Sequence, residues 1–282
     1  MNSNKRIVAI QGIAGSFHDE AAAAYFAPGY ETVPCDTFRD LFKALDKRKA
    51  THAVMAIENT VAGTILPNYA LLRNSAIQII GEVYVAIRQN LLALPGQTLE
   101  HLREVHSHPM AIQQCQEYFE KHPHIRLVET HDTAASAAWI AKKRKRTIGA
   151  IAGKHAARMY GLHILGSGIE SDKRNFTRFL VLAHGSSVNG NAATADKASI
   201  AFHLPHTKGS LAHVLTMLAE YGCNLTKIQS LPVLGREWEY FMHIDLEFDA
   251  HDELRRALQA VEPHVNELKI LGEYQRGKKQ VA

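Results

Sequence analysis

Apolar runs and amphipathic segments alternate through the first part of the chain. The segments RIVAIQG (6–12) and HAVMAIENT (52–60) read as buried strands, whereas TFRDLFKALDK (37–47) has the i, i+3, i+4, i+7 apolar spacing of a helix. The same reading predicts strands at 104–107, 125–129 and 147–151 and helices at 65–73, 109–120, 133–143 and 153–160. The pattern predicts an α/β region with largely parallel sheets, and a longer strand region at 76–94 marks the crossing into a second lobe, about 82–165.

The pattern changes in the last third of the chain. Residues 185–196 are small and polar and read as a linker. Beyond them, KASIAFHL and EYFMHIDLEF alternate as half-buried strands do, and SLAHVLTMLAEYG and HDELRRALQAV have helical spacing. The order β-α-β-β-α-β predicts a ferredoxin-like α+β module at 197–277, so that residues 1–184 form a separate two-lobed region.

Composition narrows the class of protein and of ligand. The 282 residues carry a net charge of +4, which suits an anionic small molecule and does not require nucleic acid. No run approaches the ~20 apolar residues of a membrane helix, and no secretory leader is evident. Three widely spaced cysteines fit a reducing cytoplasm. The histidines show no HExxH or similar spacing, so we expect no metal and no cofactor.

Polar residues follow several of the predicted strands. In open α/β sheets, ligands bind beyond the carboxyl ends of the strands, where helix N-termini offer free N–H groups. Taken singly, each residue has an ordinary structural explanation: Ser16, Ser107 and Thr133 are N-cap types, Asn59 can bond its own turn, and Arg178 can form a surface ion pair. Taken together, they indicate a site for a small, oxygen-rich, charged ligand.

The loops in order resemble the prephenate dehydratase family. The resemblance runs through GIAGSFHDEAA, IENTVAGT, SHPMAIQQC, DTAASAA and NFTRFLVL, and continues through GSLAHVL and NLTKIQSLP. It implies a catalytic region built like a two-lobed periplasmic binding protein, with the active site in the cleft. It also implies a C-terminal ACT domain that senses phenylalanine and joins subunits into a homo-oligomer.

The resemblance assigns roles to residues of the strand ends. The TRF motif maps to Thr177, Arg178 and Phe179: Thr177 would donate a hydrogen bond to the departing ring hydroxyl of prephenate, Arg178 would hold an anion, with the pyruvyl carboxylate favoured, and Phe179 would wall the ring. The remaining substrate-binding positions are expected at Ser16, Glu58, Asn59, Thr60, Ser107, Gln114 and Thr133.

The module departs from the family at its regulatory motifs. Its expected effector residues are Gly209, Ser210, Leu211, Ala212, Asn224, Leu225, Gln229 and Ser230. The family's GALA motif is GSLA here, and its ESRP motif is QSLP, so that Gln229 replaces a glutamate and Leu231 an arginine. Phenylalanine feedback and a dimerisation domain without effector therefore both stay open.

Three functions remain after this reading. The first is the decarboxylating dehydration of prephenate to phenylpyruvate in phenylalanine biosynthesis. Arogenate dehydratase is the second, because arogenate differs only by an amino group in place of the keto group. A non-catalytic amino-acid sensor is the third, and the TRF motif with Asn59, Ser107 and Gln114 argues against it.

Overall fold

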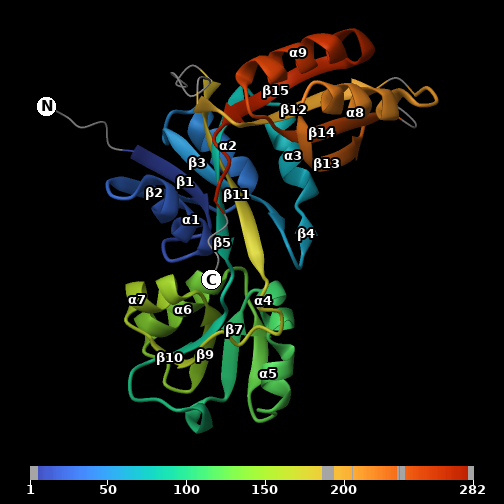
Figure 1. Cartoon of the computed structure of the whole chain (residues 1–282). Coiled ribbons are helices and arrows are strands. Elements are labelled where there is room, and N and C mark those ends of the chain that lie inside the picture. Colours follow the sequence, from blue (N-terminus) through green and yellow to red (C-terminus); the bar gives the residue numbers. More distant parts are fainter. Residues whose placement is uncertain (1–5, 186–193, 205, 234, 236–238, 279–282) are drawn as a thin grey trace, which may run out of the picture. The chain divides into compact units, whose positions relative to one another are not determined.

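The computed structural model describes residues 6–185, 194–204, 206–233, 235 and 239–278 (Figure 1). Contacts divide the chain into two compact units. The described residues of the first fall within Met1–Thr64 and Val83–Phe179, and the second is formed by Ile65–Glu82 and Leu180–Lys278. Most of the predicted linker, at 186–193, lies outside the described residues.

The first lobe is built on parallel strands with helices between them. Its elements are β1 (Arg6–Gln11), α1 (Phe17–Phe26), β2 (Tyr30–Cys35), α2 (Phe38–Asp46), β3 (His52–Asn59) and β4 (Gly63–Thr64). Strand β1 pairs in parallel with β2 and β3. The sheet order is β2-β1-β3-β11-β5, with β5 at Ile77–Ala86 and β11 at Phe176–His184. The alternation of the sequence predicts this core correctly but misses β2, a half-exposed edge strand that contains Pro34.

The second lobe has its own five-stranded sheet. Its elements are β6 (Asn90–Ala93), η1 (Leu99–His101), β7 (Glu104–Ser107), α4 (Pro109–Gln114), α5 (Gln116–Glu120), β8 (Arg126–Glu129), α6 (Thr133–Lys143), β9 (Ile148–Ala152), α7 (Lys154–Tyr160) and β10 (His163–Gly166). The order is β10-β6-β9-β7-β8, and β6 runs antiparallel to both β9 and β10. The expectation of largely parallel sheets therefore holds for β7, β8 and β9 but not for the other edge.

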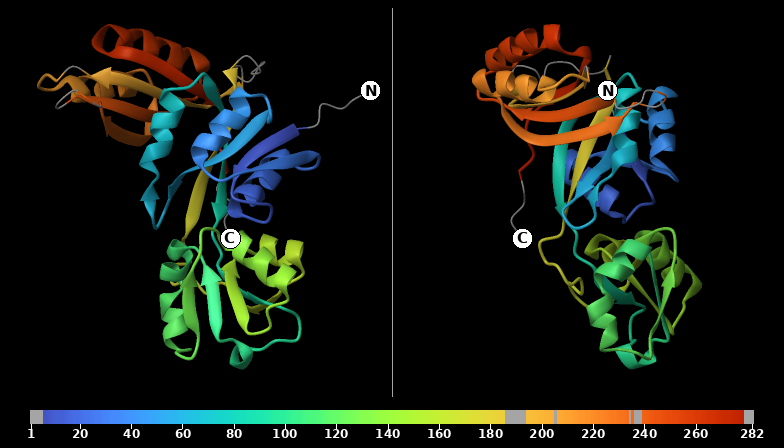
Figure 2. Two further views of the ribbon diagram at one scale, coloured as in Figure 1. Left: turned by 180° about the vertical axis from the view of Figure 1, so that it is seen from behind. Right: turned by 90° about the vertical axis from the view of Figure 1, so that its right-hand side faces the viewer.

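Helices cover both faces of this second sheet (Figures 1 and 2). Leu91 packs with α4 and α5, whereas its neighbour Leu92 packs with α6 and α7, because successive side chains of a strand point to opposite faces. The single helix predicted at 109–120 is wrong: it divides into α4 and α5 at Cys115, whose backbone (φ −109°, ψ 9°) leaves the helical region.

The C-terminal module has the predicted β-α-β-β-α-β order. Its elements are β12 (Lys197–Leu204), α8 (Ser210–Glu220), β13 (Asn224–Pro232), β14 (Tyr240–Glu247), α9 (His251–Val261), η4 (Glu262–His264) and β15 (Asn266–Tyr274). The antiparallel sheet has the order β13-β14-β12-β15. Helices α8 and α9 cover one face of it (Figure 2), over a core that includes Phe202, Ile244 and Leu254.

The same compact unit includes helix α3 (Leu66–Arg73) and the first part of β5. Tyr69 makes an edge contact with the ring of His243, at 5.1 Å between centroids, and the Arg73 guanidinium lies 3.9 Å from the centroid of Phe241. The Lys269 Nζ donates to the carbonyl oxygens of Arg73 (2.7 Å) and Ser75 (2.5 Å), which closes the end of α3. Segment 65–82 is therefore packed against the module sheet.

A buried ion pair joins this segment to β12. The Lys197 Nζ lies 3.0 Å from Glu82 Oε1, and the two side chains are 3% and 1% exposed. Glu82 Oε1 also accepts from the Gly277 N–H at 3.0 Å, and Glu247 Oε1 lies 3.6 Å from Lys197 Nζ. These partners offset the cost of placing two charges away from water.

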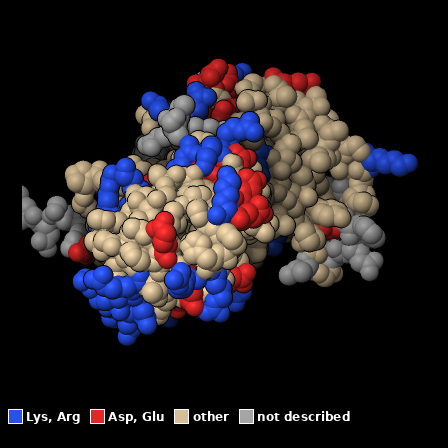
Figure 3. All heavy atoms as spheres, turned by 90° about the horizontal axis from the view of Figure 1, so that it is seen from below, with Lys and Arg blue, Asp and Glu red and all other residues tan. Residues whose placement is uncertain are grey.

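The KKRKR run at 142–146 begins in the last turn of α6 and continues beyond its end. All five side chains are exposed, and Lys and Arg gather at the edge of the face shown in Figure 3. The run is thus a solvated helix end, and its cations suit the negative C-terminal end of the helix dipole. In the described part of the chain, no helix is long and apolar enough to cross a membrane.

Candidate functional site

The ends of β3 and β11 bring Asn59 and Thr177 together. The Asn59 Nδ2 donates to Thr177 Oγ1 at 2.9 Å. Thr177 is only 8% exposed. Among the described residues, its hydroxyl has Asn59 as hydrogen-bond partner and no acceptor takes the hydroxyl proton. Because a lone pair of the oxygen is already occupied, the Thr177 O–H is left to act as a donor.

Glu58, next to Asn59, and Arg178, next to Thr177, form a second pair between these strand ends. Arg178 Nη1 lies 3.7 Å from Glu58 Oε1, and the side chains are 3% and 29% exposed. Neighbouring residues of a strand point to opposite faces, so that Arg178 and Thr177 face opposite sides of β11. The prediction that Arg178 holds a substrate anion beside Thr177 stays a prediction, with Glu58 as its present counter-charge.

Phe179 lies deeper in the lobe than the other TRF residues. Its side chain is 1% exposed, and its ring meets the ring of His18 edge-on at 5.0 Å between centroids. The Nε2 of His18 accepts from the Ala56 N–H at 3.4 Å. Phe179 thus supports the strand end through packing, and its contact with a substrate ring stays a prediction.

His18 is expected to make stability depend on pH. Burial lowers its pKa from 6.5 to about 3, so that the unfolded chain binds this proton more readily than the folded chain between those values. Stability present above pH 6.5 is therefore lost as pH falls toward 3, by up to about 1.4 kcal/mol per pH unit. A His18→Gln variant keeps an acceptor for Ala56 but should flatten this slope.

Urea unfolding at a series of pH values checks the effect. Comparison of the variant with the wild type at pH 7.5 gives the packing cost alone, because an imidazole of ordinary pKa is mostly neutral there. Parallel stability curves between pH 6.5 and 4 would contradict the assignment.

Thr60 ties the loop after β3 to the start of β11. Its Oγ1 donates to the Arg174 carbonyl at 2.8 Å and accepts from the Phe176 N–H at 2.9 Å. Its own N–H donates to the Phe176 carbonyl at 2.9 Å. Thr60 is exposed, and these bonds show it holding the loop in place; its predicted contact with substrate stays a prediction.

Gln114 reaches the same cluster from the second lobe. Its Oε1 accepts from Asn175 Nδ2 at 3.0 Å and from Gln89 Nε2 at 3.3 Å. The Asn175 Oδ1 in turn accepts from Asn59 Nδ2 at 2.7 Å. The structure thus brings together three of the predicted residues, Asn59, Gln114 and Thr177, through Asn175.

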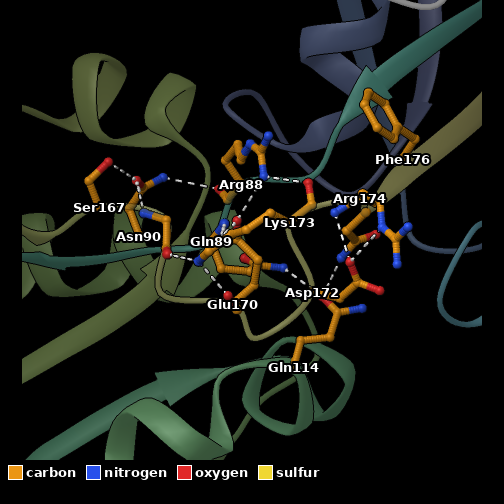
Figure 4. Close-up of polar contacts among 12 residues, drawn as sticks. Arg88, Gln89, Asn90, Gln114, Ser167, Glu170, Asp172, Lys173, Arg174 and Phe176 are labelled. Atoms are coloured by element: carbon orange, nitrogen blue, oxygen red, sulfur yellow. Dashed lines mark hydrogen bonds and ion pairs between the residues drawn. The ribbon is translucent and has the colours of Figure 1, made fainter. Parts of the chain in front are cut away.

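The buried carboxylate of Glu170 holds Gln89 in place. Glu170 is 1% exposed, and its two oxygens accept from Gln89 N (2.8 Å) and Arg88 Nη1 (3.2 Å) (Figure 4). The Lys173 Nζ lies 3.8 Å from the same carboxylate. Sequence reasoning missed Arg88, Gln89 and Glu170, which lie in loops without any motif spacing. Asn175 belongs to the NFTRF motif, which is the signal that could have found it.

A cavity of about 520 Å³ opens beside Gln114 and Asn175. Its lining includes the carboxylates of Glu117, Glu120, Glu170 and Asp172, and none of its described lining residues is Lys or Arg. This lining disfavours a dianion. The predicted site is therefore better centred on Thr177 than on this cavity.

The N-termini of α1 and α6 meet beside Gly12. Ser16 caps α1, as predicted, and its Oγ accepts from the Asp19 N–H at 3.3 Å. A Cβ added at Gly12 (φ +87°) would lie 2.7 Å from Asp132 Oδ2 and 3.7 Å from the Ser16 Cβ. Only glycine fits this approach of the two lobes. Burial raises the pKa of the Asp132 carboxyl.

The capping roles expected of Ser107 and Thr133 are wrong. His108 caps α4 by accepting from the Met110 N–H, and Asp132 caps α6 by accepting from Ala135 N at 2.6 Å. Ser107 is fully buried, and its Oγ donates to the Ile151 carbonyl at 2.7 Å. Thr133 is the first residue of α6, half-buried. The substrate contacts of both stay predictions.

A second cavity lies in the C-terminal module. It has a volume of about 270 Å³, and its lining includes Ser210, Leu211 and Ser230. Gly209 (φ +81°) is the N-cap residue of α8 beside it, and Ala212 lies exposed on the helix. The other expected effector residues are on β13: Asn224 is exposed, Leu225 packs against the module core, and Gln229 Nε2 donates to the Ser230 carbonyl at 2.9 Å.

Metal ligands do not gather in the described residues: no three or more His, Cys, Asp or Glu side chains there are placed to hold an ion.

Comparison with known proteins identifies relatives of the whole chain. The family model "Prephenate dehydratase" matches residues 8–187. The "Arogenate dehydratase/prephenate dehydratase 2, chloroplastic" of Arabidopsis thaliana is 36% identical over 97% of this chain and 74% of its own. The "Bifunctional chorismate mutase/prephenate dehydratase" of Neisseria gonorrhoeae is 33% identical over 95% of this chain and 74% of its own.

Solved structures agree with these sequence relatives. A prephenate dehydratase from Arthrobacter aurescens in complex with L-Phe has a TM-score of 0.84 and 27% identity, covering 98% of this chain and 92% of its own. A protein described as GqqA, a novel type of quorum quenching acylase, has a TM-score of 0.86 and 30% identity, covering 96% and 98%. By its family model and by these relatives, the chain belongs to the prephenate dehydratase family.

Proposed function

We propose that the chain converts prephenate to phenylpyruvate by loss of carbon dioxide and the ring hydroxyl. In this step the bond to the ring carboxylate breaks, its electron pair enters the ring, and the C–O bond opposite breaks. The ring becomes aromatic, and the departing oxygen leaves as hydroxide or, after protonation, as water. The substrate and product follow from the family; the observation in this chain that supports the reaction is the Thr177 O–H, left as a donor by Asn59.

Thr177 would act at the departing oxygen. A threonine hydroxyl is a weak acid, but it forms a stronger hydrogen bond as negative charge develops on the leaving oxygen, which lowers the transition state more than the ground state. Burial of Thr177 at 8% exposure strengthens such a bond by excluding water. Arg178 would hold the pyruvyl carboxylate, which remains in the product, from the opposite face of the β11 strand end, where Glu58 Oε1 is its present partner at 3.7 Å.

An assay of phenylpyruvate release by the purified protein tests the proposal. We expect turnover of prephenate without added metal or cofactor. Absence of product from a folded, homogeneous preparation would overturn the proposed function and revive the amino-acid sensor.

Arogenate is the second candidate substrate, because several relatives are named arogenate dehydratase. Prephenate and arogenate present the same ring hydroxyl to Thr177 and differ only at the side chain. The ratio of kcat/KM for the two substrates, measured side by side, decides between them. An acylase assay of the same preparation tests the activity that is named for the structural neighbour GqqA.

The module cavity supports an amino-acid effector. Helix α8 begins at Ser210, which lines this cavity, and a helix N-terminus offers N–H groups to a carboxylate. We propose phenylalanine as the ligand, since the Arthrobacter aurescens neighbour is in complex with L-Phe.

A phenylalanine titration of turnover checks regulation. Gln229 and Leu231 lack the charges of the family motif, so we expect phenylalanine to inhibit the wild type weakly. A Gln229→Glu/Leu231→Arg variant should be inhibited at about tenfold lower phenylalanine concentration. That shift corresponds to one added polar contact of about 1.4 kcal/mol. An unchanged response in this variant would mean that these positions do not set effector affinity.

We also propose the domain limits 1–184, 185–196 and 197–277, a cytoplasmic location, and assembly through the module. The three cysteines are free and buried, as in proteins of a reducing compartment. The module's edge strand β13 has no fully buried residue, and Ile228 on it is 44% exposed. An open edge of this kind pairs readily with a second copy, and light scattering of the purified protein measures the assembly.

A further inference from the structure

Four side-chain amides form a continuous chain that ends at Thr177. Gln89 Nε2 donates to Gln114 Oε1, Asn175 Nδ2 donates to the same oxygen, Asn59 Nδ2 donates to Asn175 Oδ1, and Asn59 Nδ2 donates to Thr177 Oγ1. Gln89 and Asn175 are 3% and 1% exposed. We call Gln89, Gln114, Asn175 and Asn59 the amide relay.

Backbone groups fix the direction of the relay. Asn59 Oδ1 accepts from the N–H groups of Val61 (2.9 Å) and Ala62 (2.7 Å). A backbone N–H can only donate, so that the oxygen of Asn59 must face this turn and its nitrogen must face β11. The opposite rotamer would bring two pairs of donors together.

This direction passes from one amide to the next. Because Asn59 presents its nitrogen, Asn175 must present its oxygen to Asn59 and therefore its nitrogen to Gln114. Gln114 must then present its oxygen, which leaves its own nitrogen pointing away from Gln89, as Figure 4 shows. The N–H groups of Val61 and Ala62 therefore set the direction of every hydrogen bond in the relay. As a result, the Thr177 O–H and the Gln114 Nε2 are both available to donate.

We propose that Asn175 is a positioning residue that keeps the donor groups of Asn59 and Gln114 in this direction, an inference that rests on the proposed function of Thr177. Asn175 contacts neither the leaving oxygen nor the ring in this scheme. It acts through Asn59, because the neutral amide accepts from Asn59 and donates to Gln114 at once, which an ionised carboxylate of the same size cannot do.

The Asn175→Asp variant replaces the donating amide nitrogen of residue 175 with an accepting oxygen and hardly changes the shape of the side chain. The ionised carboxylate of this variant still accepts from Asn59, but its second oxygen faces the oxygen of Gln114 at the former 3.0 Å. We expect kcat at pH 8 to fall about 10- to 100-fold, the range that a small misplacement of a catalytic group produces. As pH falls, the protonated carboxyl group donates to Gln114 again, so that kcat relative to the wild type should recover.

Gln113→Glu is the matched control. Gln113 is exposed on α4 beside Gln114 and lines the same cavity, so that the control adds the same charge without entering the relay. A loss in Asn175→Asp that is independent of pH, or one equalled by Gln113→Glu, overturns the proposal. So does an Asn175→Asp kcat within twofold of the wild type at pH 8.

Two further measurements separate the relay from folding and from the proposed function. If Asn175→Asp does not fold, Gln114→Glu replaces it. This variant keeps the accepting oxygen, so that kcat should fall less than tenfold while KM rises. A collapse of kcat overturns the assigned direction.

If the wild type does not turn over prephenate, the proposed function fails by itself. The carbon-13 titration of the carboxyl group introduced by Asn175→Asp then decides the relay: a pKa raised above that of an ordinary aspartate supports it, and an ordinary or lowered pKa overturns it.

Discussion

Replacing Thr177 with valine is expected to lower kcat for prephenate by about 10²- to 10⁴-fold, the range supplied by a positioned proton donor. Valine has nearly the same shape as threonine, so that the end of β11 should keep its packing at this buried position. Asn59 Nδ2 keeps two acceptors, Asn175 Oδ1 and the Phe176 carbonyl, after the hydroxyl is removed. The loss would therefore report on chemistry and not on unfolding.

Thr177→Ser is the matched control for this variant. Serine keeps the hydroxyl and the bond from Asn59, so that kcat should stay within about tenfold of the wild type, the remaining loss reflecting the freer rotation of serine. Steady-state kinetics with prephenate, together with a thermal unfolding curve for each variant, gives the comparison. Near-full turnover in Thr177→Val would remove the donor role from the mechanism.

Replacing Lys197 with methionine is expected to lower the free energy of unfolding by about 3–5 kcal/mol, as breaking a buried ion pair does. The change leaves the Glu82 carboxylate, 1% exposed, without the ammonium 3.0 Å away. The Gly277 N–H still donates to this carboxylate at 3.0 Å, but a neutral donor does not replace a positive charge beside a buried carboxylate. Chemical denaturation at pH 7 measures the loss.

The double variant Lys197→Met/Glu82→Gln separates charge from packing. Glutamine at position 82 removes the negative charge and keeps an oxygen for the Gly277 N–H, so that more than half of the lost stability should return. If the single variant costs less than about 1 kcal/mol, the pair is worth no more than a surface ion pair. If the double variant is no better than the single one, the loss comes from the methionine side chain itself.

The sequence predicts the strands that carry the site better than it predicts the contacts between them. The runs that end at Asn59 and begin at Phe176 are apolar and buried, and hydrophobic patterning finds such strands. The pairing of Asn59 with Thr177 joins residues 118 positions apart. No local pattern determines that contact, and the family resemblance assigns both residues to the site without pairing them.

Capping and packing residues were harder to predict for a different reason. Ser107 and Thr133 are favourable N-cap types, yet His108 and Asp132 accept the first N–H groups, because α4 begins at Pro109 and α6 at Thr133 and the N-cap is the residue just before each. Helix boundaries of this kind depend on the tertiary path of the chain. Glu170 and Gln89 support the site through buried hydrogen bonds that only the folded chain reveals.

The packing of segment 65–82 on the module sheet has a consequence for how the chain can be divided. A cut after residue 184, where the sequence places the boundary, would leave α3 and the buried carboxylate of Glu82 without Lys197 and Lys269. The fragment 1–184 would then expose to water the side chains of α3 that pack on the module sheet, and the Glu82 carboxylate would lose the ammonium beside it. Excision at that point would yield a fragment prone to aggregate, so that the two-lobed region and the C-terminal module are better transferred together in a fusion protein.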